Sequence, residues 1–346
     1  MEPICPVFGK CGGCLYQDIS YEDELKIKEK TLRSLIKNKI DVPDDRFRDI
    51  VPSPTAYYYR NRLDLRLLKT KNKDIFIGFS PNKGFGVIEI NKCFIARKEI
   101  SDFIPELKKQ AAAILPERYR LANLVVRTGD DGRVFWGGIG RRSCQLDEKD
   151  YLWTQIRGKR IFYSLDTFFQ ANLSILPKLF DILLSFNCIN HNTLLFDLYG
   201  GVGLFAIVLA DKVNRAYIIE ENKSSVKLAK YNIKFNNLSN IEVIKGKVEE
   251  RYSVIIEKVK DIDCQHKVAI IDPPRAGLSR YILNMLVAGL AQKLDYILYL
   301  SCYPESLVRD LRELVNANWA VNHVIPFDFF PRTRHIETLV ILSKIR

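Results

Sequence analysis

The feature that most restricts the fold is the alternation of buried strands and amphipathic helices over residues 193–315. Five apolar runs there each precede a segment of helical periodicity, such as SSVKLAKYNIKFNN; they are TLLFDL, RAYIIE, IEVIKG, VAIIDPP and YILYLSC. Alternation of this kind builds a parallel sheet with helices on both faces. Two more runs, AVNHVIPF and IETLVILSKI, follow without a helix between them and predict a hairpin at one sheet edge. The sequence therefore predicts a doubly wound α/β domain.

The earlier part of the chain has a different pattern, and the change falls near residues 160–170. Short apolar runs with Gly, Asn and Asp turns between them predict strands at 63–68, 75–79, 87–90, 121–127 and 133–136. Charged helical stretches are expected at 22–37 and 99–114. We therefore predict two domains, a β-rich region over residues 1–165 and an α/β domain over residues 166–346.

Charge and hydrophobicity restrict the partners of this chain. Its 53 Lys and Arg residues outnumber its 41 Asp and Glu residues, for a formal net charge of +12 in 346 residues. This excess favours a polyanion, with nucleic acid ahead of an anionic membrane. No apolar stretch approaches the roughly 20 residues that span a bilayer, and MEPICPVFGK does not read as a signal peptide. We expect a cytoplasmic protein without a membrane partner, whose eight cysteines are thiols, metal ligands or a nucleophile.

A glycine-rich turn, Asp197-Leu198-Tyr199-Gly200-Gly201-Val202-Gly203, lies between a predicted strand and an apolar helix. Glycines there let the backbone approach a ligand at the helix N-terminus, and a nucleotide-like cofactor fits that position. Glu220 ends the next strand, where a carboxylate accepts hydrogen bonds from ribose hydroxyls. Ala206 stands where the dinucleotide fingerprint has its third glycine, so S-adenosylmethionine is favoured over NAD.

Two further loops at the same predicted sheet edge carry reactive groups. Two prolines after the strand 268–271 stiffen the loop that presents Asp272. Cys302 follows the strand 296–300 and precedes a helix, whose N-terminal potential lowers the pKa of a nearby thiol. We therefore expect Asp272 at the ligand-binding edge and Cys302 as a candidate nucleophile.

Cysteines and arginines near the N-terminus suggest two more sites. Cys5, Cys11 and Cys14 are spaced for a metal site, with Cys93 as the best fourth ligand, and this spacing leaves both zinc and a [4Fe–4S] cluster open. In the segment YYYRNRLDLR, residues 57–66, alternation places arginines on one strand face beside tyrosines. Such arginines can bind phosphates while the tyrosines stack on unpaired bases, so the segment predicts RNA as the partner.

Taken in order, these segments resemble the RNA uracil-C5 methyltransferase family, which makes 5-methyluridine in tRNA and 23S rRNA. The landmarks are CPVFGKCGGC, YYRNRLDLRL, FFQAN, DLYGGVGLF, IDPPRAGL, LSCYP and PRTRHIE. The resemblance implies a class I, Rossmann-like S-adenosylmethionine methyltransferase domain, with a smaller N-terminal β-rich domain that carries an iron–sulfur cluster and binds RNA. We also expect a monomer.

The resemblance assigns roles to individual residues. Cys302 becomes the nucleophile and Glu337, in His335-Ile336-Glu337, the general base. The remaining assignments are the S-adenosylmethionine contacts Gln170, Tyr199, Glu220 and Asp272, and the [4Fe–4S] ligands Cys5, Cys11, Cys14 and Cys93, with zinc the less favoured metal. Thiolate addition at C6 of uracil makes C5 a nucleophile toward the methyl group, and the base then removes the C5 proton. The target uridine must lie outside a base stack.

The sequence departs from the family pattern at three positions. Gly200 replaces a common cysteine, Tyr303 replaces the Asn of SCNP, and Lys247 stands where an acidic or amide residue often faces the adenine. The chain also begins almost at the cysteine array, without room for the N-terminal TRAM barrel of many relatives. That feature and the cysteine spacing favour 23S rRNA, with a uridine-54-type tRNA enzyme as the alternative.

Two other functions fit parts of this sequence. An RNA-binding module that has lost catalysis is one, but Cys302, Glu337 and Asp272 are all present. An amino-group methyltransferase with an NPPY-type site is the other, and DPPR followed by a cysteine after the next strand argues against it. An RNA uracil-C5 methyltransferase is the leading hypothesis.

Overall fold

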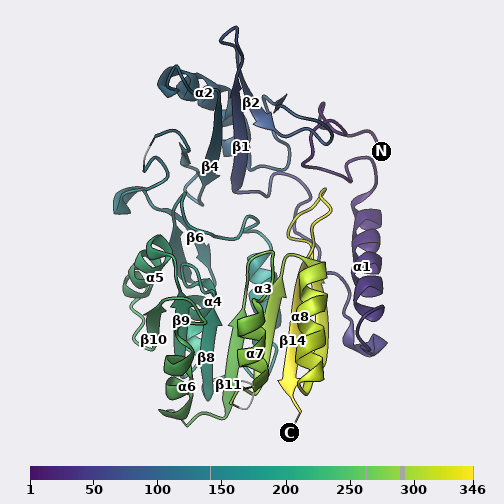
Figure 1. The fold of residues 1–346 in the computed structure, drawn as a ribbon, viewed down its shortest axis with the longest axis vertical. Coiled ribbons are helices and arrows are strands. Elements are labelled where there is room, and N and C mark those ends of the chain that lie inside the picture. The colour runs from purple at the N-terminus through teal and green to yellow at the C-terminus, as the bar shows by residue number, and fades with distance from the viewer. Residues whose placement is uncertain (141, 262, 289–292, 346) are drawn as a thin grey trace.

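The computed structural model describes all residues except 141, 262, 289–292 and 346. Figure 1 shows a small sheet with one helix above a larger sheet that is flanked by helices. Within the described residues, none of the helices combines the length and the apolar composition that a bilayer crossing requires.

The larger sheet has seven strands in the order β10-β9-β8-β11-β12-β14-β13. Their bounds are β8 Thr193–Leu198, β9 Arg215–Glu220, β10 Ile241–Lys245, β11 His266–Ile271, β12 Tyr296–Ser301, β13 Trp319–Phe327 and β14 Glu337–Lys344. The first five are parallel, and β14 pairs antiparallel with both β12 and β13. The predicted doubly wound sheet with an antiparallel hairpin at one edge is confirmed.

Helices cover both faces of this sheet, as the apolar strands require. They are α3 Leu176–Leu184, α4 Leu204–Leu209, α5 Lys223–Phe235, α6 Tyr252–Asp261, α7 Arg280–Ala288 and α8 Pro304–Asn316, with a 3₁₀ turn at Ala210–Lys212. Successive side chains of β8 enter opposite cores: Leu195 packs with Phe180, whereas Leu194 packs with Trp319. Burial on both faces explains why β8 has no exposed position.

The smaller sheet is antiparallel, with the strand order β3-β2-β1-β4-β5. Its strands are β1 Arg62–Lys69, β2 Ile75–Phe79, β3 Ile88–Glu89, β4 Leu121–Thr128 and β5 Val134–Gly137, and α2, Lys98–Ile114, packs against it. Leu63 and Leu65 of β1 face the same core as Ile104 and Leu107 of α2. The five predicted strands and the predicted helix are therefore confirmed.

One hairpin was missed from the sequence because it lies where the pattern changes. Strands β6, Leu152–Ile156, and β7, Lys159–Tyr163, follow a 3₁₀ turn at Glu148–Asp150 and form a two-stranded sheet. Asn232 of α5 bonds to the backbone of Phe162 in both directions, at 2.8 and 3.0 Å, so the hairpin packs on the α/β sheet. The predicted division at residue 165 stays a prediction.

An N-terminal segment also crosses to the larger sheet. Helix α1, Tyr21–Lys37, lies beside α8 in Figure 1, and a 3₁₀ turn at Asp44–Arg46 follows it. The amides of Arg48 and Val51 then donate to the backbone carbonyls of β13 at 3.0 and 2.8 Å. This segment satisfies part of the outer edge of the sheet, which would otherwise offer free hydrogen-bonding groups to other chains.

Candidate active site

Four of the predicted site residues lie at one edge of the larger sheet. Tyr199, Glu220, Asp272 and Cys302 end or follow β8, β9, β11 and β12, which are neighbours in the sheet. The carboxyl ends of parallel strands meet at one edge, where α/β proteins bind their ligands. The topology therefore brings together residues that are up to about one hundred positions apart in the sequence.

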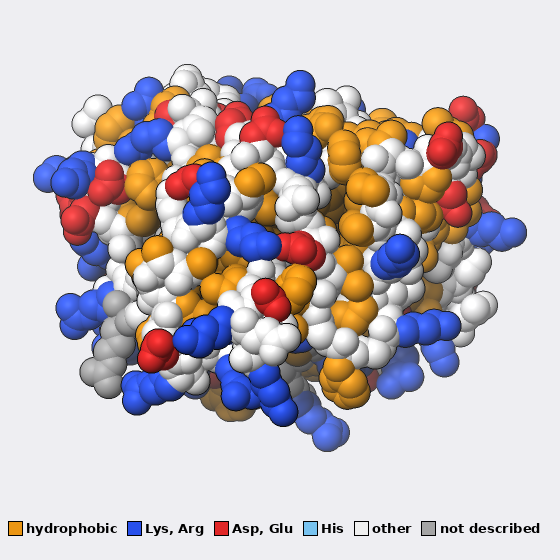
Figure 2. Space-filling view, turned by 90° about the horizontal axis from the view of Figure 1, so that it is seen from above, with side chains coloured by type: hydrophobic (Ala, Val, Ile, Leu, Met, Phe, Trp, Pro, Cys, Tyr) orange, Lys and Arg blue, Asp and Glu red, His pale blue; other side chains and the backbone are white. Residues whose placement is uncertain are grey.

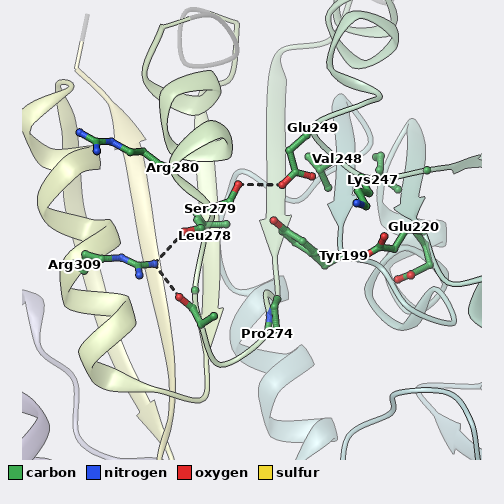
Figure 3. Close-up of a pocket in the computed structure, with 15 residues that line it drawn as sticks. Tyr199, Glu220, Lys247, Val248, Glu249, Pro274, Leu278, Ser279, Arg280 and Arg309 are labelled. Carbon is green, nitrogen blue, oxygen red and sulfur yellow. Dashed lines mark hydrogen bonds between the residues drawn. The ribbon is translucent and has the colours of Figure 1, made fainter.

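A cavity of about 570 Å³ opens at this edge. Tyr199, Glu220 and Lys247 line one side of it, and Ser279, Arg280 and Arg309 contribute to the other, as Figure 3 shows. The hydroxyl of Ser279 donates to Glu249 at 3.0 Å across the cavity wall. Its size lies within the range of about 300–1,000 Å³ that is typical of small-molecule sites. Cys302 and Glu337 are not among its lining residues.

The glycine turn and Glu220 hold each other in place. The amides of Gly201 and Asn222 donate to the two carboxylate oxygens of Glu220 at 2.8 and 2.6 Å. A Cβ atom on Gly200 would lie 2.7 Å from the side chain of Ile218. The absence of a side chain at position 200 therefore lets the turn lie close against β9.

Asp197, the first residue of the glycine motif, was not predicted to act in the site. It is fully buried on β8, and one of its oxygens accepts from the amide of Ala206 in α4 at 3.1 Å. Burial raises its pKa to about 7, and the charges of Asp272 and Glu220 act in the same direction. The signal that could have identified Asp197 was its place at the start of the Asp-x-x-Gly run. Its hydrogen bond joins β8 to α4, the helix that follows the glycine turn.

Gln170 and Asp272, both predicted cofactor contacts, are bonded to each other. The side-chain amide of Gln170, which is 4% exposed, donates to Asp272 at 3.0 Å. Burial raises the pKa of Asp272 to about 7, and the hydrogen bond from Gln170 opposes that shift. Phe168, two residues before Gln170, stays 66% exposed and lines a small pocket beside Asp272.

A buried arginine of the smaller sheet supports the Gln170 loop, and sequence reasoning missed it. The guanidinium of Arg127, on β4, donates to the carbonyls of Ser164, Thr167 and Phe169 at 2.8 to 3.0 Å. Burial lowers the pKa of Arg127 to about 9. Because these carbonyls belong to the turn that precedes Gln170, the smaller sheet contributes directly to the geometry of the cofactor edge.

Cys302 and Glu337 come together through the antiparallel pairing of β12 and β14. Ser301 pairs with Thr338, so the next position places Cys302 opposite Glu337. Glu337 is 2% exposed, and its Oε1 has no hydrogen-bond partner among the described residues. Burial raises the pKa of Glu337 well above its usual value; the charge of Asp272 adds to this shift and Arg275 opposes it.

The expected lowering of the Cys302 pKa by the helix N-terminus is wrong. The pKa of this thiol is raised to about 12, first by burial and then by the charges of Glu337 and Asp272, while Arg275 opposes the shift. Burial, together with two nearby carboxylates, outweighs the potential at the start of α8. Near neutral pH, Cys302 is therefore a thiol.

The four predicted cluster cysteines lie near one another at the end of the smaller sheet. Burial raises the pKa of Cys14 to about 12, and the charges of Cys93, Cys11 and Cys5 act in the same direction. Cys11 bridges to Pro81 next to β2, which brings the N-terminal segment onto the sheet. Across the described part of the chain, however, no group of three or more His, Cys, Asp or Glu side chains is placed to hold a metal ion.

The basic and aromatic segment is only partly available to RNA. Arg62 is engaged by Asp64 at 2.8 Å, while Arg66 is exposed. Tyr59 is 3% exposed and donates to the carbonyl of Pro331, so it does not offer a stacking face, whereas Tyr58 is 38% exposed. Figure 2, which looks onto the end of the molecule with the smaller sheet, shows Lys and Arg side chains interleaved with hydrophobic patches.

Comparisons with known proteins agree with this geometry. The sequence model of a family described as tRNA (Uracil-5-)-methyltransferase matches residues 139–345. Proteins named uncharacterized RNA methyltransferases are similar over 99% of this chain: one from Clostridium acetobutylicum is 26% identical with 84% of its length covered, and one from Caldanaerobacter subterraneus is 29% identical with 85% covered.

A solved structure shares the fold. It is the Pyrococcus abyssi tRNA (uracil-54, C5)-methyltransferase in complex with S-adenosyl-L-homocysteine, with a TM-score of 0.70 and 22% sequence identity. The similarity covers 96% of this chain and 86% of that chain. It confirms the Rossmann-like methyltransferase fold for the present molecule.

Proposed function

The chain belongs to the tRNA (uracil-5-)-methyltransferase family, and from this premise we propose that it methylates C5 of a uridine in RNA through a covalent bond between Cys302 and C6. The observation that carries the proposal is that Cys302 and Glu337 directly flank the last pair of β12 and β14, Ser301 with Thr338, and that Glu337 and Asp272 both act electrostatically on the Cys302 thiol. A thiol and a buried carboxylate beside a cofactor-sized cavity suit addition, methyl transfer and proton removal.

The residues at the sheet edge fit S-adenosylmethionine. Glu220 keeps lone pairs for ribose hydroxyls after accepting two backbone amides, and Tyr199 and Lys247 line the same cavity. Gln170 and Asp272 offer polar groups to the amino-acid end. When bound, the cofactor supplies an electrophilic methyl group on a positively charged sulfur.

We propose the following roles for the reacting side chains. Cys302 loses its proton to solvent and its sulfur bonds to C6, which moves the C5=C6 electron pair toward O4 and makes C5 nucleophilic. C5 then bonds to the methyl group, whose bond to the positively charged sulfur would break and leave its electron pair on that sulfur as a neutral thioether. Oε1 of Glu337 accepts the C5 proton, the C5–H electron pair restores the C5=C6 bond, and the C6–S bond breaks to free Cys302. Arg275 lowers the pKa of Cys302 and of Glu337, and so favours both ionised groups.

We also propose that Cys5, Cys11, Cys14 and Cys93 hold a [4Fe–4S] cluster. The charges of neighbouring cysteines raise the pKa values of Cys14 and Cys93, so these thiols lie within electrostatic reach of one another. Close thiols of this kind suit a cluster that is bound by several thiolates. The cluster would join residues 5–14 to the loop that precedes α2. Iron and acid-labile sulfide analysis of anaerobically purified protein tests this proposal.

For the substrate, we propose 23S rRNA first, from the cysteine spacing, and a monomeric enzyme that acts on an unstacked uridine. Uridine 54 of tRNA is the second candidate, because the Pyrococcus abyssi protein with the same fold acts there by its name.

The test is incubation of the purified protein with S-adenosylmethionine and unmodified transcripts of 23S rRNA and of tRNA, followed by mapping of 5-methyluridine. We expect product in the rRNA transcript. Product in tRNA alone would replace the first substrate with the second, and no 5-methyluridine in either would contradict the proposed function.

A further inference from the structure

Two arginines without a carboxylate partner among the described residues, Arg60 and Arg334, both act on His335, which lies two residues before Glu337. Arg60 and His335 lie against the same aromatic ring, that of Phe330, at 5.9 and 6.0 Å from its centroid. Arg334 is the exposed neighbour of His335 in the loop that ends at Glu337. The cations Arg275, Arg334 and Arg60 all act on His335: its pKa falls to about 4, first through burial and then through these charges, so it is neutral.

Neither arginine is neutralised within the part of the chain that the structure describes. No ion pair is formed there by Arg60 or Arg334, and the buried Nε of Arg60 has no hydrogen-bond partner. Arginines elsewhere in the same region behave differently: Arg62 is paired with Asp64 at 2.8 Å, and Arg332 lies 3.6 Å from Glu24. A desolvated guanidinium N–H without an acceptor is costly, and an anionic ligand would satisfy it.

The backbone holds Arg60 firmly at the cofactor edge. Its amide donates to Ile95 at 2.8 Å, its carbonyl accepts from Arg97 at 2.8 Å, and the next amide, of Asn61, donates to Ala171 at 2.9 Å. Ala171 directly follows Gln170, which bonds to Asp272. The backbone at Arg60 is therefore joined to the loop that carries Gln170.

A buried ionic network anchors the loop that carries Arg334. Lys28 of α1 lies 2.7 Å from both Glu24 and Asp328, and Glu24 accepts from the amide of Arg332 at 2.7 Å. The guanidinium of Arg332 also donates to the carbonyls of Tyr16 and Ile19. Because both ends of the loop are fixed, by Asp328 and by Glu337, Arg334 is presented from a rigid support.

We propose that Arg60 and Arg334 bind the phosphate groups that flank the target uridine, and so form a nucleotide site next to Cys302. Guanidinium groups bind phosphate oxygens with paired hydrogen bonds, which suits the unpaired donors here. The charge of Arg275 acts on His335, as do those of Arg60 and Arg334, and it also acts on Cys302 and Glu337. The inference rests on the proposed function and names the part of RNA that its site recognises.

The probe is a fluorescently labelled RNA pentanucleotide with one central uridine, compared with the same RNA carrying neutral methylphosphonates at the two linkages that flank it. With wild-type protein, we expect the neutral probe to bind about a hundredfold more weakly, because both phosphate contacts, each worth about tenfold as a charge-assisted hydrogen bond, are lost. Arg334→Gln should weaken binding of the charged probe about tenfold. It should weaken binding of the neutral probe less than about twofold, because that probe already lacks the phosphate charge that Arg334 binds.

The salt dependence supplies an independent readout. The slope of log affinity against log salt should fall by about 0.7 in Arg334→Gln, the value for one phosphate contact on a single strand. Lys230→Gln on α5 removes one exposed charge away from the site and should leave the affinity and the discrimination between probes unchanged. Arg60→Lys keeps the charge, and should retain part of the discrimination if the protein folds normally.

Equal binding of the charged and neutral probes by wild-type protein, or equal weakening of both by Arg334→Gln, would overturn the phosphate site. Binding is measured without methyl transfer, so the two proposals are judged separately. Discrimination between the probes by a protein that makes no 5-methyluridine would support the phosphate site and contradict the proposed function. Formation of 5-methyluridine by a protein that binds the two probes equally would support the proposed function and contradict the phosphate site.

Discussion

The two ends of the site differ in how far their polar groups are satisfied before any ligand binds. At the cofactor end, both oxygens of Glu220 accept backbone amides, and Gln170 donates to Asp272. At the reacting end, Oε1 of Glu337 has no partner among the described residues, and burial with neighbouring carboxylates raises the pKa of Cys302 to about 12.

This difference teaches that binding and chemistry are prepared in opposite ways. The cofactor end is preorganised, so that ligand recognition needs little rearrangement of the protein. The reacting end holds groups whose charged forms are disfavoured until positive charge and the substrate arrive. Changes at the reacting end should therefore affect turnover more than cofactor affinity, and changes at the cofactor end should do the opposite.

The largest expected effect is that of Cys302→Ala. Loss of the sulfur removes the step that activates C5, so the methylation rate should fall by at least about 10⁴-fold. The affinity for S-adenosylmethionine, measured by calorimetry, should stay within about twofold because Cys302 does not line the cofactor cavity. If the variant lost affinity for S-adenosylmethionine by as large a factor as it lost rate, the separation of cofactor binding from chemistry would be contradicted.

Glu337→Gln should have the next largest effect. The amide has no basic oxygen for the C5 proton, so kcat should fall by about 10²- to 10⁴-fold. Methylated RNA should stay bonded to the protein, visible as a slower band on a denaturing gel with ordinary uridine RNA. A slow variant without such a band would mean that the buried carboxylate serves another step.

Glu220→Gln tests the cofactor end. The substitution removes the negative charge of the group that accepts from the amide of Gly201 and, in our proposal, from the ribose hydroxyls. The affinity for S-adenosylmethionine should therefore fall by about 10- to 100-fold. The rate at saturating cofactor should change little. Glu250→Gln, at an exposed position outside the cavity lining, is the matched control and should bind normally. Equal affinities for the two variants would contradict the role of Glu220.

The smallest expected effect concerns the ionisation of Cys302. Its raised pKa means that alkylation by iodoacetamide should be slow near neutral pH and should speed up as the pH rises. In Glu337→Gln a neutral amide replaces a carboxylate that disfavours the thiolate, so the pKa should fall and alkylation at about pH 8 should be several-fold faster. Cys264 is the internal control, because Lys267 and Asp263, not Glu337, act on its thiol. Mass spectrometry of the two peptides measures both rates, and an unchanged Cys302 rate would contradict this electrostatic account.

Local patterns allowed the sequence to predict much of the sheet and the cofactor edge. Leu194 and Leu195 belong to opposite cores, as expected for a strand that is buried on both faces. Glu220 was found because its position at a strand end follows from chain order and parallel pairing. Such features depend on neighbours within about twenty residues along the chain.

What the sequence did not predict depends on contacts between distant segments. Arg127 gains its role only when β4 meets the turn before Gln170, and the environment of Cys302 depends on two carboxylates from other strands. Lys28 and Asp328 are 300 positions apart, yet they anchor one loop. Neither the direction of a pKa shift nor a buried ion pair is visible before the fold places these groups together.

The covalent bond between Cys302 and a uracil ring is the central claim, and peptide mass analysis tests it most directly. The protein is incubated with S-adenosylmethionine and RNA that carries 5-fluorouridine, which has no C5 proton for Glu337 to remove, and is then digested with protease and nuclease. The account predicts that the peptide with Cys302 gains the mass of a methylated fluorouridine nucleotide. A modified RNA product with Cys302 unaltered, or the added mass on a different cysteine, would contradict it.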